Sequence, residues 1–274
     1  MRLINTETLT LEEFIRKELP PYAILSHTWD DDEVTFDEFK KDPTSAQVRG
    51  RKGYVKIQKT CQLAIKSGLR YAWVDTCCIN KSSSSELSEA INSMYQWYRK
   101  CDACYAILSD LALEGEETFE EALSKSRWFS RGWTLQELIA PREVHFFDRL
   151  WHERGTKTEH RAILSKITGI DTGILHLATT GLSSLGKLLS NTAVATKMRW
   201  ASKRQTTRPE DGAYCLLGIF NVHMPLLYGE GSNAFRRLQE EIAKRSSDLS
   251  LFAWQADANA SRYTGLFAPS AALF

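Results

Sequence analysis

Four short apolar segments stand out in the first half of the chain, each rich in β-branched and aromatic residues. They are YAILS at 22–26, RYAWVD at 70–75, ACYAILSD at 103–110 and EVHFFD at 143–148. Each is a nearly continuous apolar run, which is typical of strands covered on both faces in a parallel sheet. The pattern therefore predicts four parallel strands.

Helical patterns separate these segments. From Tyr54, apolar residues recur at three- and four-residue spacing until Gly68, a natural C-terminal stop. Ser83 and Glu86 have the spacing of a capping box ahead of a second apolar stripe. Two more helices are expected, one within EETFEEALSKS (116–126) and one from near Ser130 to the residue before Pro141.

Alternation of strands and helices predicts an α/β fold with a doubly wound parallel sheet over residues 1–150. In such sheets the functional crevice lies beyond the carboxyl ends of the strands. We therefore expect a ligand site at that edge, where polar residues collect. These residues are Ser26, His27, Thr28 and Trp29 after the first segment, Asp75 to Asn80 after the second, and Ser109 and Asp110 after the third.

Residues 151–274 have a different character. Helical patterns at 163–170 and 234–245 flank a Ser/Thr/Gly-rich connection from 178 to 192. The sequence predicts a helical extension packed on the core, so that 1–150 and 151–274 together form one domain. The apolar ending of the chain suggests a fragment of a longer protein.

The stretch RGWTLQELIAP (131–141) carries the main candidate for chemistry. In a helix, Trp133 and Glu137 lie one turn apart on the same face. Partial burial beside an indole would raise the pKa of the carboxyl group, and nearby Arg131 would lower it, so the sign of the shift is open. A carboxylate beside an indole suits cleavage of a bond to a sugar's anomeric carbon. A core tryptophan with a capped or ion-paired glutamate is the structural alternative.

Residues that follow the first two strands are candidates for ligand binding. His27 and Trp29, which follow Ser26 in SHTW, can orient a phosphate or ribose, although a histidine in this position more often caps a turn. Asp75 either binds ligand or caps the CCIN loop. The chain has neither a GxGxxG nor a GxxxxGK[ST] fingerprint.

Two motifs in the second half have open roles. Arg208, Glu210 and Asp211 precede an apolar run, where acidic residues favour a helix N-terminus. The GEG turn around Glu230 either receives a phosphate on its amides or is only a turn.

Composition narrows the class of protein. Thirty-five basic and 34 acidic residues give a formal net charge of +1, which disfavours a nucleic-acid partner. The start of the chain is charged, and no run of about 18 apolar residues follows, so we expect a cytoplasmic protein without a membrane segment. Six cysteines are expected to be reduced and buried. A zinc site is disfavoured because Cys77 and Cys78, in an extended stretch, would point to opposite sides.

Four motifs together resemble the HET domain of fungal heterokaryon incompatibility proteins, over about 20–244. They are YAILSHTW, YAWVDTCCINKSSSSELSEAINSMYQWYRKC, SRWFSRGWTLQELIAP and TTRPEDGAYCLLGIFNVHMPLLYGEG. The resemblance implies a cell-death effector of fungal immunity or allorecognition, with a C-terminal sensor region elsewhere in the full-length protein.

HET domains are in turn distantly similar to TIR domains, which have a flavodoxin-like core. Many catalytic TIR domains cleave NAD with a glutamate in a WxxxE pattern, and Trp133 with Glu137 matches it. The resemblance implies that Glu137 is catalytic and that NAD is substrate with no other cofactor. From their places at the strand ends and around this helix, we expect six residues to bind substrate: Ser26, His27, Trp29, Asp75, Arg131 and Trp133. The resemblance also implies activation by homo-oligomerisation. The alternative is a non-enzymatic module that self-associates and signals through protein partners.

Overall fold

A computed structural model describes residues 1–15, 18–112, 118–176, 182–256 and 265–274. Its described part contains a seven-stranded mixed sheet with strand order β2-β1-β4-β3-β5-β6-β7. The strands are β1 (Arg2–Asn5), β2 (Leu11–Glu13), β3 (Tyr22–His27), β4 (Tyr71–Trp73), β5 (Ala103–Ile107), β6 (His145–Phe147) and β7 (Glu153–Thr156).

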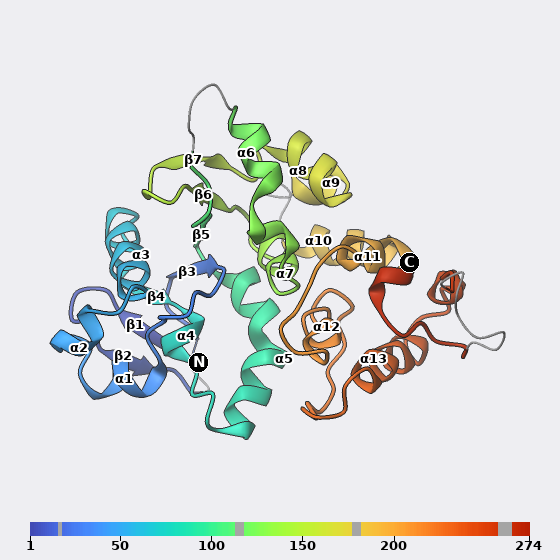
Figure 1. The fold of residues 1–274 in the computed structure, drawn as a ribbon, viewed down its shortest axis with the longest axis horizontal. Helices are drawn as coiled ribbons and strands as arrows, with labels where there is room; N and C mark the ends of the chain where they lie inside the picture. Colours follow the sequence, from blue (N-terminus) through green and yellow to red (C-terminus); the bar gives the residue numbers. More distant parts are fainter. Residues whose placement is uncertain (16–17, 113–117, 177–181, 257–264) are drawn as a thin grey trace.

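The centre of the sheet consists of β4, β3, β5 and β6, which are all parallel. These are the four strands predicted from the apolar runs, although three of the runs extend beyond their strands. β3 is buried along its whole length because helices cover both faces of the sheet. Figure 1 shows α3 on one side of the sheet and α5 and α7 on the other.

Three antiparallel strands that the sequence did not predict complete the sheet. β1 pairs with β4, and β2 pairs with β1 at one edge. β7 pairs with β6 at the other edge, so the sheet continues past residue 150. The prediction of an α/β fold is confirmed and the four predicted strands are parallel, but the sheet as a whole is mixed because both of its edges are antiparallel.

Helices of the first half connect the parallel strands. They are α1 (Phe36–Lys41), α2 (Ala46–Arg49), α3 (Tyr54–Lys66), α4 (Asp75–Cys78), α5 (Ser84–Lys100), α6 (Phe119–Lys125), the 3₁₀ turn η1 (Arg127–Ser130) and α7 (Thr134–Ile139).

The helix ends predicted from capping residues are confirmed in part. Gly68 follows α3 with a φ of 72°, as a left-handed helix stop requires. At α5, the Ser83 hydroxyl accepts from the Glu86 backbone N–H, but the Glu86 carboxylate binds the Asn80 backbone N–H instead of completing the box. The fourth predicted helix is divided, since η1 precedes α7 and α7 itself begins only at Thr134.

The expectation that Cys77 and Cys78 lie in an extended stretch is wrong. Both belong to the short helix α4, where Cys78 Sγ is the acceptor for the Val74 backbone N–H. All six cysteines are buried free thiols. They fill space in the core as small apolar side chains.

The second half of the chain is mainly helical, as predicted. Its elements are α8 (Arg161–Thr168), α9 (Thr172–Leu175), α10 (Leu182–Asn191), α11 (Val194–Ala201), α12 (Asp211–Tyr214), α13 (Asn233–Ala243), η2 (Leu249–Phe252) and η3 (Ala271–Leu273).

The predicted connection at 178–192 is a helix over most of its length. Residues 178–181 lie outside the described residues, and α10 covers Leu182–Asn191. Leucines in this segment recur at three- and four-residue spacing, and Leu185 and Leu189 are buried. Apolar periodicity therefore outweighs the Ser/Thr/Gly composition.

The extension packs against the face of the core formed by α5 and α7, and α11, α12 and α13 lie beyond these two helices in Figure 1. One close contact is that of Gly218 with Tyr95 of α5, where a Cβ atom on Gly218 would lie 2.1 Å from Tyr95 Cβ. Buried side chains of both halves belong to one hydrophobic cluster. The two halves therefore share one core.

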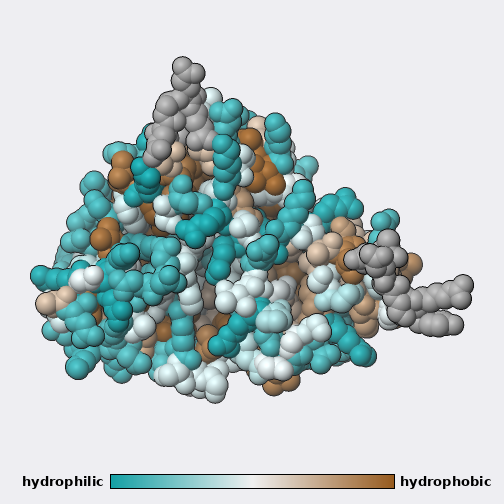
Figure 2. All heavy atoms as spheres, in the orientation of Figure 1, coloured by the Kyte–Doolittle hydropathy of each residue, from teal (hydrophilic) through white to brown (hydrophobic). Residues whose placement is uncertain are grey.

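Polar side chains cover most of the face seen in Figure 2, with apolar side chains in small patches. No helix in the described part of the chain is long and apolar enough to cross a membrane.

Candidate functional site

Glu137 lies inside the molecule, next to the carboxyl end of β3. Its Oε2 accepts a hydrogen bond of 2.5 Å from Ser26 Oγ, and the Trp128 indole N–H donates to the same hydroxyl at 2.8 Å. β3 contributes Ser26, η1 contributes Trp128 and α7 contributes Glu137. One continuous hydrogen-bonded chain thus joins β3 to η1 and α7, two consecutive segments that lie much later in the sequence.

Burial dominates the electrostatics of Glu137, whose exposed fraction is 7%. It raises the pKa of the carboxyl group to about 8, even though the Ser26 hydrogen bond favours the charged form. The negative charge of Asp75 acts in the same direction as burial, while Arg131 and Arg204 oppose it. The open sign of the shift is thereby settled as upward. At pH 7 this acid holds a proton more often than not.

Substituting Trp128 with phenylalanine should lower the free energy of unfolding by about 1 kcal/mol more than the same change at Trp73. Both tryptophans are fully buried, but Trp128 donates to Ser26, whereas the Trp73 indole N–H has no partner among the described residues. Urea denaturation of the two variants measures the difference. Equal losses would show that the Trp128 hydrogen bond contributes nothing to stability.

A second polar group lies at the same edge of the sheet. His27 Nε2 is 2.9 Å from Asp75 Oδ1, and the Trp29 indole donates to Asp75 Oδ2 at 2.8 Å. The Lys81 ammonium lies over the Trp29 ring, 3.4 Å from its centroid. Trp29 is 45% exposed, so an indole face and a cation are presented together near solvent.

Asp75 is held in its charged form by these neighbours. Partial burial acts to raise the pKa of the carboxyl group, but the hydrogen bond and charge of His27, the charge of Lys81 and the Trp29 hydrogen bond lower it to about 2. Asp75 is also the first residue of α4, where a negative charge is favourable. The structure therefore gives Asp75 a structural role in ordering His27 and Trp29. Its role in ligand binding stays a prediction.

The side chains of Trp133 and Arg131 form hydrogen bonds with residues of the helical extension. The Trp133 indole hydrogen-bonds Asp211, which also accepts from the Tyr228 hydroxyl at 3.0 Å. The Arg131 guanidinium reaches Thr207, at 3.5 Å. Both predicted binding residues thus contact the helical extension, and the indole that hydrogen-bonds beside Glu137 is that of Trp128.

The GEG turn is occupied by a carboxylate of the chain itself. Glu210 Oε1 accepts from the backbone N–H groups of Gly229 and Gly231, at 2.8 and 3.0 Å. Both glycines have positive φ, 105° and 59°, which suits a tight turn. The turn interpretation is therefore the one that the structure supports, and these amides hold a glutamate.

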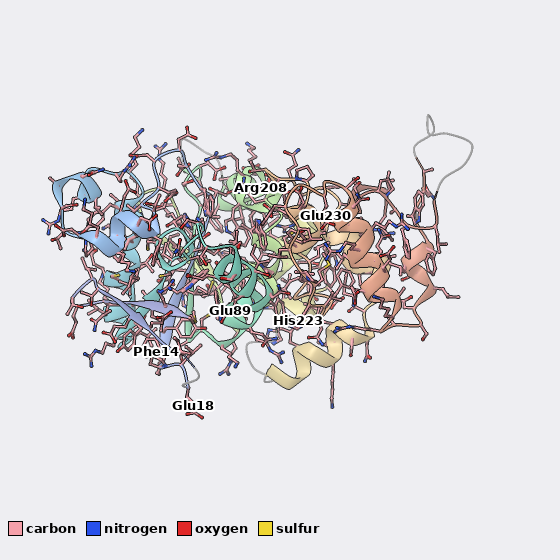
Figure 3. The ribbon with its side chains drawn as sticks, turned by 90° about the horizontal axis from the view of Figure 1, so that it is seen from below. Phe14, Glu18, Glu89, Arg208, His223 and Glu230 are labelled. Carbon is pink, nitrogen blue, oxygen red and sulfur yellow. The ribbon has the colours of Figure 1, made fainter. Side chains whose placement is uncertain are left out.

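Glu230 and Arg208 also have partners within the extension. Glu230 Oε1 accepts from the Tyr214 hydroxyl at 2.9 Å and from Arg237 Nη1 at 2.5 Å. The Arg208 guanidinium lies over the Tyr228 ring, 4.6 Å from its centroid. Figure 3 shows Arg208 and Glu230 on the same side of the molecule.

Sequence reasoning missed three residues of this region: Trp128, Lys81 and Arg204. Arg204 Nη1 donates to the Arg131 carbonyl at 2.8 Å and to Thr134 Oγ1 at 2.9 Å, which fixes the first turn of α7. The loop position of Arg204, more than 60 residues after α7, gave no signal of this contact. Trp128 lies in the quoted motif SRWFSRGW, but a tryptophan in an apolar run resembles a core residue.

Among the cavities in the described part of the chain, two lie near these elements. The larger, of about 510 Å³, lies between the N-terminal strands and α5, and Phe14, Trp73 and Glu89 are among its lining residues. The smaller, of about 320 Å³, is lined in part by Gly132 and Arg204. Glu137 lines neither of them, although Arg204 links the smaller one to its helix.

In the described part of the chain, no group of three or more His, Cys, Asp or Glu side chains is placed to hold a metal ion.

Comparison with known proteins gives the family. The family model described as heterokaryon incompatibility protein (HET) matches residues 22–120, which include β3, β4 and β5. A second model, a domain of unknown function (DUF8212), matches residues 233–266. No solved structure matches the chain.

Vegetative incompatibility protein HET-E-1 of Podospora anserina is similar to this chain over most of its length. The two are 44% identical over 235 residues, which are 83% of this chain and 16% of that protein. The aligned region therefore corresponds to a small part of a much longer relative. The chain belongs to the HET family of heterokaryon incompatibility proteins.

Proposed function

We propose that this chain is a cell-death effector domain of heterokaryon incompatibility, and that it cleaves the nicotinamide-ribose bond of NAD with Glu137. The observation that carries the proposal is the Glu137 carboxyl group, which is buried without an ion pair among the described residues and bound by Ser26. A buried acid with a strongly raised pKa at the carboxyl edge of an α/β sheet is a typical catalytic group. Family membership supports the biological part of the proposal.

The TIR-like part of the proposal is supported by topology. The central parallel strands have the order β4-β3-β5-β6, in which the first parallel strand, β3, has its successors on both sides. The switch point therefore lies beside β3, whose end carries Ser26. Glu137 reaches this point from α7, and Trp133 precedes it by four residues as in the WxxxE pattern.

In the proposed reaction, ionised Glu137 stabilises the positive charge that develops on the ribose. The bond between C1′ of the ribose and N1 of the nicotinamide breaks, and its electron pair leaves with neutral nicotinamide. Water adds to C1′ and loses a proton, which gives ADP-ribose. Because the pKa of Glu137 is about 8, the ionised fraction and hence the rate should rise between pH 6 and pH 9.

The proposal includes assembly of several copies. Its reason is that Glu137 is buried in the single chain, where its exposed fraction is 7%. We propose that contacts between copies open a crevice beside Ser26, and that further regions of the full-length protein control this step. The Trp29 indole, with Lys81 above it, is then available to a base and a phosphate of the substrate.

Cleavage is tested by incubating the chain with NAD after clustering it through a fused oligomeric tag. Nicotinamide release, followed by HPLC, should fall at least tenfold in Glu137→Gln. Exposed Glu89 on α5 provides the matched control, and Glu89→Gln should keep the rate of the parent.

A non-enzymatic module that acts through self-association and protein partners is the second candidate, and the near-complete burial of Glu137 favours it. If clustered Glu137→Gln cleaves NAD as fast as the parent, Glu137 is not catalytic. If the clustered parent cleaves no NAD while its expression still kills cells, the second candidate is correct.

A further inference from the structure

The Trp128 indole is held in one orientation inside the core. Its side chain is fully buried, and its ring makes edge-to-face contacts with Phe129 and with Phe146 of β6, at centroid distances of 5.0 and 5.9 Å. Buried aromatic rings prefer such arrangements. The Thr134 hydroxyl of α7 donates to the Trp128 carbonyl, which ties the backbone at this position to the first turn of α7. Ring and backbone contacts together therefore direct the indole N–H at Ser26.

The chemistry of the three groups sets the direction of their two hydrogen bonds. An indole N–H can only donate, so Ser26 Oγ accepts the bond from Trp128, at 2.8 Å. An ionised carboxylate can only accept, so the Ser26 hydroxyl must direct its proton at Glu137 whenever Glu137 is charged. Hydrogen bonds in a chain strengthen one another, and a bond to an ionised acceptor is the stronger kind. The indole therefore stabilises the charged form of Glu137 more than the neutral form.

Other titratable groups act on the Glu137 carboxyl group directly. They are Asp75 of α4, Arg131, Arg204, Tyr98 of α5 and Cys104 of β5. Burial has the largest effect on the pKa of Glu137, the carboxylate of this set adds to it, and the two guanidinium groups oppose it. Burial also raises the pKa of the phenol and of the thiol, so both stay neutral. Trp128 differs from all of these because it carries no charge and reaches Glu137 only through Ser26.

We propose that Trp128 is a positioning residue for Glu137: its indole N–H aims the Ser26 hydroxyl proton at the carboxylate and so favours the ionised form that the cleavage step needs. The catalytic part of this inference rests on the function proposed above. The effect on ionisation does not depend on NAD cleavage.

The test follows the ionisation of Glu137 directly. The 274-residue chain is labelled with carbon-13 at the glutamate carboxyl carbon and titrated by NMR, and the signal that is missing in Glu137→Gln assigns the resonance. The midpoint of the parent is expected at about pH 8. Trp128→Phe should raise this midpoint by about 0.5 pH unit or more.

Two further variants make the result specific to the indole N–H. Trp128→benzothienylalanine replaces the N–H with sulfur and keeps the shape of the ring, so it decides the question if Trp128→Phe does not fold, and it should raise the midpoint as well. Trp73→Phe is the matched control, because Trp73 is equally buried but its N–H has no partner among the described residues. It should titrate as the parent does. A smaller rise in a folded Trp128 variant, or an equal rise in Trp73→Phe, would overturn the proposal.

The pH dependence of NAD cleavage separates this inference from the proposed function. In the clustered chain, Trp128→Phe should cleave NAD about threefold more slowly than the parent at pH 7 and at nearly the parent's rate at pH 9.5. An equal loss at both pH values would show a merely structural role and overturn the proposal. No cleavage by the clustered parent would count against the proposed function, whereas a raised midpoint in the NMR titration would still support the effect of Trp128 on Glu137.

Discussion

Replacing Glu137 with glutamine should make the folded chain more stable, by about 3 kcal/mol at pH 7. The side chain keeps its size and its oxygen for the Ser26 hydrogen bond, but, unlike glutamate, glutamine does not ionise in the unfolded chain, so the unfolded state loses that stabilisation. Burial raises the pKa of Glu137 from 4.5 to about 8, so the native state binds this proton more tightly than the unfolded chain does. The wild-type carboxyl group therefore makes its full contribution to stability below pH 4.5 and loses it as the pH rises through 8.

Urea denaturation at pH 5 and pH 8 measures this effect. The gap between Glu137→Gln and the parent should be small at pH 5 and largest at pH 8, and Glu89→Gln should show no such change with pH. A glutamine variant that is less stable than the parent at pH 8 would contradict the prediction. A gain in stability with a loss of NAD cleavage would be the trade-off expected of a functional acid.

Gly218→Ala should destabilise the chain by about 3 kcal/mol or more. An added Cβ would lie 2.1 Å from Tyr95 Cβ and 2.3 Å from Tyr95 Cγ, far inside van der Waals contact. Tyr95 is 4% exposed and belongs to α5, so it cannot move aside without displacing the helix that joins core and extension.

Gly265→Ala is the control for this substitution, because no atom of the described residues, apart from its chain neighbours, lies within 4 Å of the added Cβ. It should change the free energy of unfolding by less than about 0.5 kcal/mol. The urea midpoints of the two variants measure the contrast. Similar midpoints would mean that α5 and the segment around Gly218 adjust to each other freely.

The parallel centre of the sheet could be predicted because its strands are continuous apolar runs between helical patterns. The antiparallel strands could not, since β2 (LEE) and β7 (ERGT) are short and charged and have no apolar run. The same limit applies to α10, whose serines suggested a loop while Leu185 and Leu189 formed the buried face. Composition is a weaker guide than periodicity in such segments.

The candidate site was predicted in part. Ser26 and Glu137 meet as a direct contact, and His27, Trp29 and Asp75 form a second group at the same edge. Their convergence follows from the rule that parallel strands end at one edge.

The neighbours of Trp133 could not be predicted from periodicity. Apolar periodicity specifies which face of a helix is buried, but not which element packs against that face. In this chain Asp211, from the extension, binds the Trp133 indole.

The antiparallel borders of the sheet restrict how copies of this chain can join. β2 and β7 are three and four residues long, and each carries charged side chains. Such borders discourage a strand from another molecule from adding on. Amyloid-like stacking through these strands is therefore disfavoured, and a filament or ring of HET domains would be held together by helix and loop surfaces, with each sheet remaining a separate unit.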